Sequence, residues 1–477
     1  MARVRQLTML ITLVVGLTFS VPVGAGAAGS GAWTTYGFDN ARTGYNPNET
    51  TITPATAANL TTKWTAAETG NTQGITAQPV TNNGTVYWGS WDGYEHATNA
   101  STGTQRWSRF LGLTSAAGCN PPVTGVANTA TVASLSINGQ RRSVLFVGGG
   151  GNVATADSQA RLYALDALTG AVLWKTDLGP APATFMWSSP AYFNGSVYVG
   201  IASFGDCPLV QGRLVKLDAT TGVVQTAFNV VQDGCTGGGI WSSPAIDEVD
   251  GTLYFSTGNP ASCSTQPYGI AIVELRLADL SVVGYWSVPF SSQVDDGDFG
   301  ATPVLFTAKS GALLRRLVGV ANKNGLYYAF SRNHLTAGPV WKTRVAVGGD
   351  CPQCGSGSIG ASASDGTSVF VAGGSTTING VNCFGSVQAL NPGNGQVLWQ
   401  VCFSALSDGP VLGAVSVIPG VVLVGEGNSL VLIDAASGTT LKQLTSQTGA
   451  AFWGTPSVSN GQVYIGDMSG LLYAFGL

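Results

Sequence analysis

Histidine is almost absent from this sequence, because only His96 and His334 occur among its 477 residues. Catalysis that depends on an imidazole side chain therefore has little support. Charge is also scarce: Asp, Glu, Lys and Arg together make up 10% of the chain, and the formal net charge is −4. No basic stripe of the kind that binds a phosphate backbone is present, so we expect no nucleic-acid partner.

Strong helix formers are few as well. Lys and Glu are sparse, whereas Gly contributes 66 residues, and Gly destabilises helix interiors. A helical bundle is therefore disfavoured. A disordered chain is also excluded, because 44% of the residues are hydrophobic. The length alone would suggest two or three domains, but a closed array of repeats can run this long as one unit.

The first residues follow the three-part pattern of a secretory leader. Arg3 and Arg5 precede an almost entirely apolar run over residues 7–23, and small residues follow at 25–27. The run is short and lacks a basic stop signal, which favours cleavage over a membrane anchor. We therefore expect residues 1–27 to be a signal peptide, residues 28–477 to form the folded domain, and the protein to be extracellular or periplasmic. No other stretch could span a membrane.

Eight cysteines, an even number, all lie beyond this leader. In an oxidising compartment an even count is typical of disulfides. Cys351 and Cys354 form a CxxC pair, for which a zinc site, a redox pair and a haem attachment are the alternatives. Haem attachment requires His where Gly355 stands, and no second ligand pair follows to complete a zinc site. Structural disulfides are therefore favoured, and the sequence leaves their connectivity open.

A hairpin repeat runs through the chain. In each copy an alternating apolar strand is followed by Asp or Asn and, four residues later, by Gly. The Asp or Asn side chain bonds to its own backbone to start the turn, and Gly adopts the positive φ that closes it. Trp107, Trp174 and Trp399 each follow such a Gly, and we interpret them as core packing. The turn pairs are Asn99/Gly103, Asp166/Gly170, Asp218/Gly222, Asn391/Gly395 and Asp434/Gly438.

A second element precedes each hairpin, namely a short segment ending in Pro or a small residue, followed by an alternating strand. The pattern W-x-x-P occurs at 187–190, 241–244 and 453–456, and looser copies begin near Thr76, Cys119, Gly300, Gly360 and Leu412. Eight such units of four strands predict an all-β fold, an eight-bladed β-propeller. The last unit ends at Leu477 without a complete fourth strand, so we expect residues 33–64 to supply it and close the ring.

These AxDxxTGxxxW hairpins and WSSPA-type strands resemble the pyrroloquinoline quinone (PQQ) repeat over the whole mature chain. The resemblance is to quinoprotein alcohol dehydrogenases, especially the polyvinyl-alcohol-dehydrogenase-like branch, whose opening is similar to residues 39–47, DNARTGYNP. It implies a secreted enzyme that oxidises an alcohol to a carbonyl with PQQ and calcium. The implied substrate is a small-molecule or polymeric alcohol, with secondary alcohols suggested. Since no haem-binding segment is present, we expect a separate electron acceptor.

The resemblance also assigns metal and base residues. Residues 257–260, TGNP, match the family motif whose Asn ligates calcium, which is Asn259 here. Asp298 matches the Asp of the family's WDF/WDY motif, the proposed general base, and we also expect it to ligate the metal. The family's calcium-ligating Glu should fall within residues 203–211, where Asp206 is the only acidic residue. We therefore expect Asp206 as the third metal ligand. Calcium prefers several hard oxygens of this kind.

Further residues are assigned to the cofactor. Trp241 stands where the family has the Trp beneath the quinone ring, and a flat cofactor is well matched by an aromatic face. Residues 322–332, NKNGLYYAFSR, match a segment whose basic residue contacts the quinone oxygens. This assigns Lys323, with Asn324, to cofactor binding, and Lys323 also to catalysis, since it can stabilise charge on a quinone oxygen. Trp453 matches a Trp of the last blade that lines the cofactor site.

Each assignment has a structural alternative. Trp241 and Trp453 could fill a core, Asn259 could belong to a simple turn, and Lys323 could be a surface charge. The chain also lacks the family's pair of adjacent cysteines, since Cys119 is flanked by Gly118 and Asn120. A non-catalytic propeller that binds a partner on one rim is therefore the second hypothesis. A glycosidase would need two facing carboxylates, and the sequence pairs none convincingly.

Overall fold

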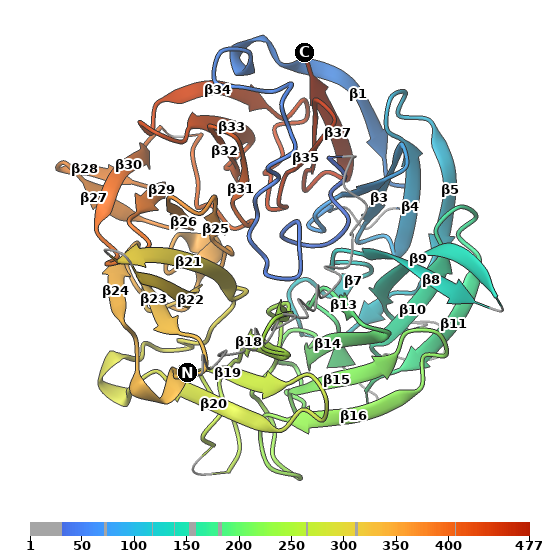
Figure 1. Ribbon diagram of the computed structural model, residues 1–477. Helices are drawn as coiled ribbons and strands as arrows, with labels where there is room; N and C mark the ends of the chain where they lie inside the picture. The colour runs from blue at the N-terminus through green and yellow to red at the C-terminus, as the bar shows by residue number, and fades with distance from the viewer. Residues whose placement is uncertain are drawn as a thin grey trace, which may run out of the picture. The chain divides into compact units, whose positions relative to one another are not determined.

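A computed structural model describes residues 31–70, 74–116, 118–137, 139–151, 159–179, 184–263, 266–310, 313–405 and 407–477. The unit Gly31–Leu477 is a closed ring of eight β-sheet blades (Figure 1). The predicted all-β, eight-bladed β-propeller is thus confirmed. The predicted signal peptide, residues 1–27, lies outside the described residues. Within the described ranges, no helix has the length and apolar character needed to cross a membrane.

Each blade is an antiparallel sheet, and the blades follow one another in chain order. Blade 1 contains β2 (Val80–Asn82), β3 (Thr85–Gly89), β4 (Tyr94–Asn99) and β5 (Gln105–Phe110). Blade 2 contains β8 (Thr131–Ile137), β9 (Gln140–Gly149), β10 (Arg161–Asp166) and β11 (Val172–Asp177). Blade 3 contains β12 (Thr184–Phe185), β13 (Ala191–Phe193), β14 (Ser196–Ser203), β15 (Arg213–Asp218) and β16 (Val224–Asn229). Blade 4 contains β17 (Ala245–Asp247), β18 (Thr252–Ser256), β19 (Ala271–Arg276) and β20 (Val282–Ser287).

The second half of the ring repeats this pattern. Blade 5 contains β21 (Val304–Ser310), β22 (Leu313–Ala321), β23 (Leu326–Ser331) and β24 (Trp341–Arg344). Blade 6 contains β25 (Ala363–Ser364), β26 (Val369–Gly373), β29 (Gly385–Leu390) and β30 (Val397–Phe403). Blade 7 contains β31 (Ser416–Ile418), β32 (Val421–Glu426), β33 (Ser429–Asp434) and β34 (Thr440–Thr445). Blade 8 contains β35 (Ser457–Ser459), β36 (Gln462–Gly466), β37 (Leu471–Gly476) and β1 (Thr61–Ala67).

An N-terminal strand closes the ring, as the sequence predicts, but it spans residues 61–67 and so runs three residues beyond the expected segment 33–64. Strand β1 pairs antiparallel with β37, from Thr61 opposite Gly476 to Ala67 opposite Leu471. Two small hairpins lie outside the blades, β6 (Thr114–Ser115) with β7 (Val123–Thr124) and β27 (Thr376–Ile378) with β28 (Val381–Cys383). The described short 3-10 turns are η1 (Ala57–Asn59), η3 (Phe290–Ser292), η4 (Leu335–Ala337) and η5 (Pro352–Cys354).

The repeat Trp residues connect each blade to the next. In blade 1, Trp107 lies against Gly170, the turn glycine of blade 2, and its Nε1 donates to Ala167 O at 3.1 Å. Gly170 has φ +67°, and the turn is held because Asp166 Oδ1 accepts from the Thr169 N–H at 3.1 Å. Trp64, Trp174, Trp341 and Trp399 make the same pair of contacts with the following blade. The Trp residues are therefore inter-blade contacts, a more specific role than general core packing.

Successive copies of the W-x-x-P element form the innermost wall of the ring. The hydroxyl of its third residue accepts an N–H from the preceding blade, so that Thr129 N donates to Ser189 Oγ at 3.0 Å and Ser189 N to Ser243 Oγ at 2.9 Å. Ser243 N donates in turn to Thr302 Oγ1 at 2.9 Å. The first residue of each copy faces the axis. The copy expected near Cys119 begins instead near Ala127, four residues before β8, as Trp187 stands four residues before β13.

The segment before β1 seals one end of the ring. Residues 33–46 enter the centre of the ring (Figure 1) and bond to the innermost strand of all eight blades. The Arg42 side chain is 1% exposed and donates to the carbonyl oxygens of Pro190 and Pro244 at 3.3 and 2.8 Å. These prolines end the W-x-x-P copies of blades 3 and 4. Residues 39–47, which carry the sequence resemblance, therefore belong to a plug that holds the blades together.

Candidate active site

Two adjoining cavities lie at the axis. The first, here called the axial chamber, has a volume of about 610 Å³ and is lined by the first residues of the eight W-x-x-P copies, with Tyr36 of the plug. These first residues are Thr76, Ala127, Trp187, Trp241, Gly300, Ile359, Leu412 and Trp453. The second, here called the acidic pocket, has a volume of about 370 Å³ and includes Asp206, Asn259, Asp296, Asp298 and Lys323. Trp187 and Trp241 line both cavities.

Trp241 is held in one orientation where the cavities meet. Its Nε1 donates to Asp298 Oδ2 at 3.1 Å. Gly300 lies against the indole so closely that a Cβ atom would overlap Cη2 of Trp241. On the acidic side, Lys323 Nζ is 5.4 Å from the centroid of the indole ring. The structure therefore presents a fixed aromatic face beside a carboxylate and an ammonium group.

Asp298 is a buried carboxylate whose Oδ2 accepts from Trp241 and whose Oδ1 faces the ammonium group of Lys323. The residue is 8% exposed, and Oδ1 lies 2.6 Å from Lys323 Nζ. Apart from this ion pair, no group in the described ranges donates a hydrogen bond to Oδ1. Burial raises the pKa of Asp298 to about 6, with the charges of Lys323 and Asp296 acting downward and upward respectively. At neutral pH the carboxylate is therefore mostly ionised and can accept a proton.

Lys323 stays charged in this environment. Burial lowers the pKa of Lys323, but the carboxylates of Asp298 and Asp296 more than offset that effect, so its pKa lies above the usual value. The pKa of Asp298 is raised because burial outweighs the ion pair there, and the pKa of Lys323 is raised because its two carboxylate partners outweigh burial. The adjacent Asn322 fixes the two segments together, since its Nδ2 donates to Gly297 O and Asp298 O at 2.9 and 3.0 Å.

Asn259 follows β18 and carries a polar atom without a partner. Its Nδ2 donates to Asp296 Oδ1 at 2.6 Å, and its buried Oδ1 has no hydrogen-bond partner among the described residues. Asp296 Oδ2 in turn accepts from Lys323 Nζ at 2.7 Å. An amide oxygen left unpartnered in a polar pocket costs free energy unless a ligand meets it. Asn259 is therefore arranged to contact a cation or a hydrogen-bond donor.

Asp206 lies on the loop after β14 and faces the same pocket. Its φ is +60°, and burial raises its pKa, with the charge of Asp296 acting in the same direction. The neighbouring Cys207 forms a disulfide with Cys119, which precedes the cavity-lining residues Asn120 and Pro121. This disulfide joins the two loops that border the pocket.

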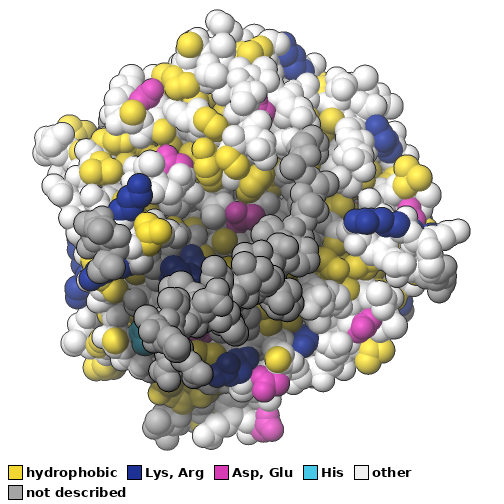
Figure 2. Space-filling view, in the orientation of Figure 1, with side chains coloured by type: hydrophobic (Ala, Val, Ile, Leu, Met, Phe, Trp, Pro, Cys, Tyr) yellow, Lys and Arg dark blue, Asp and Glu magenta, His cyan; other side chains and the backbone are white. Residues whose placement is uncertain are grey.

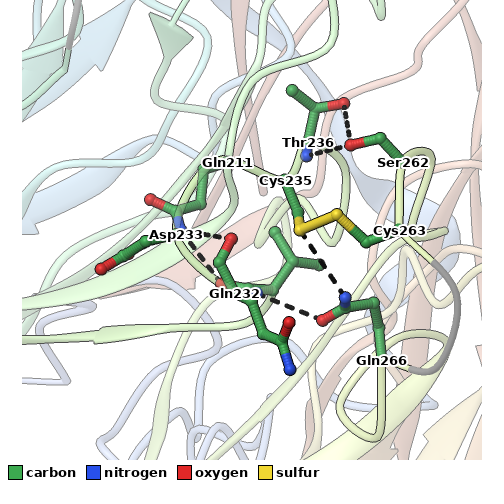
Figure 3. The surroundings of a disulfide bond; sticks show 9 residues. Gln211, Gln232, Asp233, Cys235, Thr236, Ser262, Cys263 and Gln266 are labelled. Carbon is green, nitrogen blue, oxygen red and sulfur yellow. Dashed lines mark hydrogen bonds between the residues drawn. A yellow bond between two sulfur atoms is a disulfide. The ribbon is translucent and has the colours of Figure 1, made fainter.

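The other disulfides answer the question that the sequence leaves open. They are Cys235–Cys263, Cys351–Cys354 and Cys383–Cys402, and the described residues include no free cysteine. The CxxC pair is thus a disulfide, in agreement with the favoured interpretation. Figure 3 shows Cys235–Cys263, beside which Thr236 N donates to Ser262 Oγ at 2.8 Å. This link supports the Asn259 loop, because Gly238 N donates to Asn259 O at 2.7 Å.

The donor set of the pocket fits a hard cation. The carboxylates of Asp206 and Asp298 and the free amide oxygen of Asn259 are oxygen donors of the kind that calcium prefers. No three His, Cys, Asp or Glu side chains converge as a preformed metal cage within the described ranges. A cation would thus rely on mixed donors, including Asn259. The ammonium group of Lys323 currently neutralises part of the acidic charge.

Two predicted residues lie apart from this group. Trp453 is 37% exposed and lines the axial chamber but not the acidic pocket. Asn324 lines neither cavity, since its Nδ2 donates to Ser292 O and to the Tyr328 hydroxyl at 2.9 and 2.8 Å. Sequence reasoning missed Trp187 and Asp296. Both carried a signal, because Trp187 begins a W-x-x-P copy and Asp296 stands two residues before Asp298.

Comparisons with known proteins agree with the repeats and the fold. A family model described as outer membrane protein assembly factor BamB matches residues 123–261 and 383–476. Polyvinylalcohol dehydrogenase of Sphingopyxis sp. (strain 113P3) is 26% identical, over 93% of this chain and 73% of the relative. The chain has the repeats and the fold of a PQQ-repeat quinoprotein.

Further quinoprotein relatives support the same resemblance. Polyvinylalcohol dehydrogenase of Pseudomonas sp. is 25% identical over 66% of this chain, and the chain spans about half (51%) of that relative. The crystal structure of quinohemoprotein alcohol dehydrogenase from Comamonas testosteroni superposes with a TM-score of 0.70 at 20% identity, covering 95% of this chain and 81% of that one. At this identity the superposition establishes the propeller fold of the chain.

Proposed function

We propose that this chain is a PQQ- and calcium-dependent quinoprotein dehydrogenase that oxidises an alcohol to a carbonyl and passes the electrons to a separate acceptor. The observation that carries the proposal is the buried Asp298 carboxylate, held between Trp241 Nε1 and Lys323 Nζ in a cavity wall. Burying a carboxylate opposes folding, so a site that does so is a candidate for chemistry. The alcohol dehydrogenase relatives support the reaction class.

The cavities fit a flat, carboxylated quinone. Trp241 offers an aromatic face, and the axial chamber beside it is large enough for a tricyclic ring. Ser189 and Ser243 line this chamber and use their oxygens to accept backbone N–H groups, which leaves their O–H groups free to donate to a carboxylate. Lys323 supplies positive charge at the acidic end, where Asn259, Asp298 and Asp206 would hold calcium.

A bound quinone would supply the acceptor for the hydride equivalent of the alcohol, and a calcium ion held by Asn259, Asp298 and Asp206 would supply Lewis-acid polarisation. Asp298 supplies the base. Its Oδ2 is fixed by Trp241, so Oδ1 is the oxygen that takes the hydroxyl proton. Lys323 keeps Asp298 ionised and provides a donor for negative charge that develops in the pocket. Trp241 and Gly300 set the plane on which the reacting groups are arranged.

The proposals for the compartment and the substrate rest on separate observations. Residues 1–27 have a leader pattern, and four disulfides favour an oxidising compartment, so we propose an extracellular or periplasmic location. The names of the Sphingopyxis and Pseudomonas relatives favour a secondary, polymeric alcohol as substrate. On the face shown in Figure 2, the Lys and Arg side chains of the described residues are scattered and form no single patch.

A non-catalytic propeller is the second candidate, and the BamB family match favours it. Titration of the purified protein with PQQ separates the two functions. We expect saturable quenching of Trp fluorescence near one equivalent in calcium, and loss of that quenching with a chelator or in Trp241→Ala. No binding at high micromolar PQQ would contradict the dehydrogenase proposal and favour the scaffold.

A further inference from the structure

Asp296 joins two residues of the acidic pocket through one carboxylate. Its Oδ1 accepts from Asn259 Nδ2 at 2.6 Å, and its Oδ2 accepts from Lys323 Nζ at 2.7 Å. The side chain is 43% exposed, so it lies at the mouth of the pocket, whereas Lys323 is buried. Asp295, its neighbour in sequence, does not line the pocket.

The backbone turns Asp296 inward. Its φ is +49°, a left-handed conformation that an L residue adopts only when the surrounding chain holds it there. The next residue, Gly297, is fixed because its carbonyl oxygen accepts from Asn322 Nδ2 at 2.9 Å. A Cβ on Gly297 would meet Val294 O at 2.6 Å. The tight turn over residues 294–297 thus keeps the Asp296 carboxylate beside Asn259 and Lys323.

The contact with Asn259 decides which end of the amide faces the pocket. A carboxylate accepts hydrogen bonds and cannot donate them, so it pairs only with the NH₂ end of an amide. The opposite end, Oδ1, is then directed away from Asp296, and it is the buried atom that has no partner among the described residues. In the flipped amide, two acceptors would face each other and the oxygen would be lost to the pocket.

The contact with Lys323 divides one positive charge between two carboxylates. Lys323 Nζ lies 2.7 Å from Asp296 and 2.6 Å from Asp298. An ammonium group has three donors, so both contacts can be made together. Asp296 therefore shares the positive charge of Lys323 with Asp298 and holds the ammonium group between the two carboxylates.

We propose that Asp296 is a positioning residue that holds Asn259 Oδ1 and Lys323 Nζ in the orientation needed for cation binding. The inference rests on the proposed function, since it concerns the same calcium site. It adds a residue that the family resemblance does not assign. Its role is indirect, because Asp296 acts through Asn259 and Lys323.

Calcium binding to the PQQ-free protein tests this role without relying on activity. Isothermal titration calorimetry would compare the wild type with Asp296→Ala, Asp296→Asn and the matched control Asp295→Ala. We expect Asp296→Ala to weaken calcium binding at least about tenfold, whereas Asp295→Ala stays within about twofold. Asp296→Asn keeps one oxygen, which can accept from Asn259 Nδ2 but leaves Lys323 Nζ without its second carboxylate, so we expect a loss smaller than that of Asp296→Ala. Circular dichroism melting would show that each variant is folded.

Three outcomes would overturn the proposal. Unchanged affinity in Asp296→Ala would remove the positioning role and leave the proposed function standing. Equal losses in Asp296→Asn and Asp296→Ala would show that charge, and not amide orientation, is what matters. A wild-type protein that binds no calcium would overturn this inference together with the calcium dependence of the proposed function, and PQQ quenching would then show whether a quinone site remains.

Discussion

Gly300 and Trp241 are in such close contact that no side chain could occupy position 300 without moving the indole. Gly300 begins the fifth W-x-x-P copy, at the position where blades 3, 4 and 8 carry Trp. The absence of a side chain in blade 5 therefore creates the space into which the Trp of blade 4 extends. This relationship couples the orientation of Trp241 to its hydrogen bond with Asp298.

Gly300→Ala should consequently weaken PQQ binding. Forcing a methyl group into this contact typically costs about 1–3 kcal/mol, and we expect at least about a fivefold loss of affinity in the fluorescence titration. Gly284→Ala is a matched control, since a Cβ there meets nothing closer than 3.7 Å. Equal affinities for the wild type and Gly300→Ala would show that the indole orientation is not needed.

The pH dependence of activity should report Asp298. Burial raises its pKa to about 6, and only the ionised form can act as base. We therefore expect kcat/KM to rise with pH up to about 6 and to level off above it. The charge of Lys323 lowers the pKa of Asp298, so Lys323→Met should move the acid limb to higher pH, in addition to reducing the rate. An acid limb that stays in place, or moves to lower pH, would contradict the ion pair's role.

Much of the fold could be predicted because its signals are local. The Asp-to-Gly spacing specifies the hairpins, and the W-x-x-P copies mark the innermost strands of the blades. The family motifs indicated Trp241, Asp298, Lys323, Asn259 and Asp206 as site residues, and the structure places all five at one pocket. No family motif gave a role to Asp296 or to the plug residue Arg42, and their partners lie on segments distant in sequence. Disulfide connectivity is likewise a property of the assembled ring.

The disulfide Cys119–Cys207 should matter for the site as well as for stability. It joins the loops that carry Pro121 and Asp206, and its two cysteines are 88 residues apart, a loop for which chain entropy predicts a loss of about 4.6 kcal/mol on removal. Replacing both cysteines by Ser should lower Tm and weaken calcium binding measured by calorimetry.

The outer disulfide Cys383–Cys402 provides the comparison. Its residues line neither the acidic pocket nor the axial chamber. Replacing this pair by Ser should also lower Tm, but calcium affinity should stay within about twofold of the wild type. If both double variants lose calcium affinity equally, the effect comes from general destabilisation.

Glu95 is a buried carboxyl group that reduces stability. It is 0% exposed, neither of its oxygens has a hydrogen-bond partner among the described residues, and burial raises its pKa well above the usual value. In the sheet register of blade 1, Glu95 lies opposite Gly89. The equivalent positions of blades 2 and 3 carry Leu, with Leu162 opposite Gly148 and Leu214 opposite Gly200. Glu95→Leu would place in blade 1 the residue that blades 2 and 3 carry, and should therefore stabilise the fold by about 1–3 kcal/mol at pH 7.

The pH dependence of this gain has a defined sign. Because the pKa of Glu95 is raised in the folded state, its cost to folding is absent below the unfolded pKa, grows as pH rises above that value and levels off above the folded pKa. Denaturant unfolding should show the advantage of Glu95→Leu increasing from pH 4 upward. A gain that shrinks with rising pH, or a loss of stability at pH 7, would contradict this account.

The most direct measurement of the central claim is the turnover of Asp298→Asn with an alcohol and an artificial electron acceptor, at saturating PQQ and calcium. Asn keeps the shape of the side chain and can still accept from Trp241 Nε1, but it cannot take a proton. We predict that kcat falls at least about 100-fold while PQQ affinity stays within about threefold of the wild type. Full activity in Asp298→Asn would contradict the assignment of Asp298 as the base.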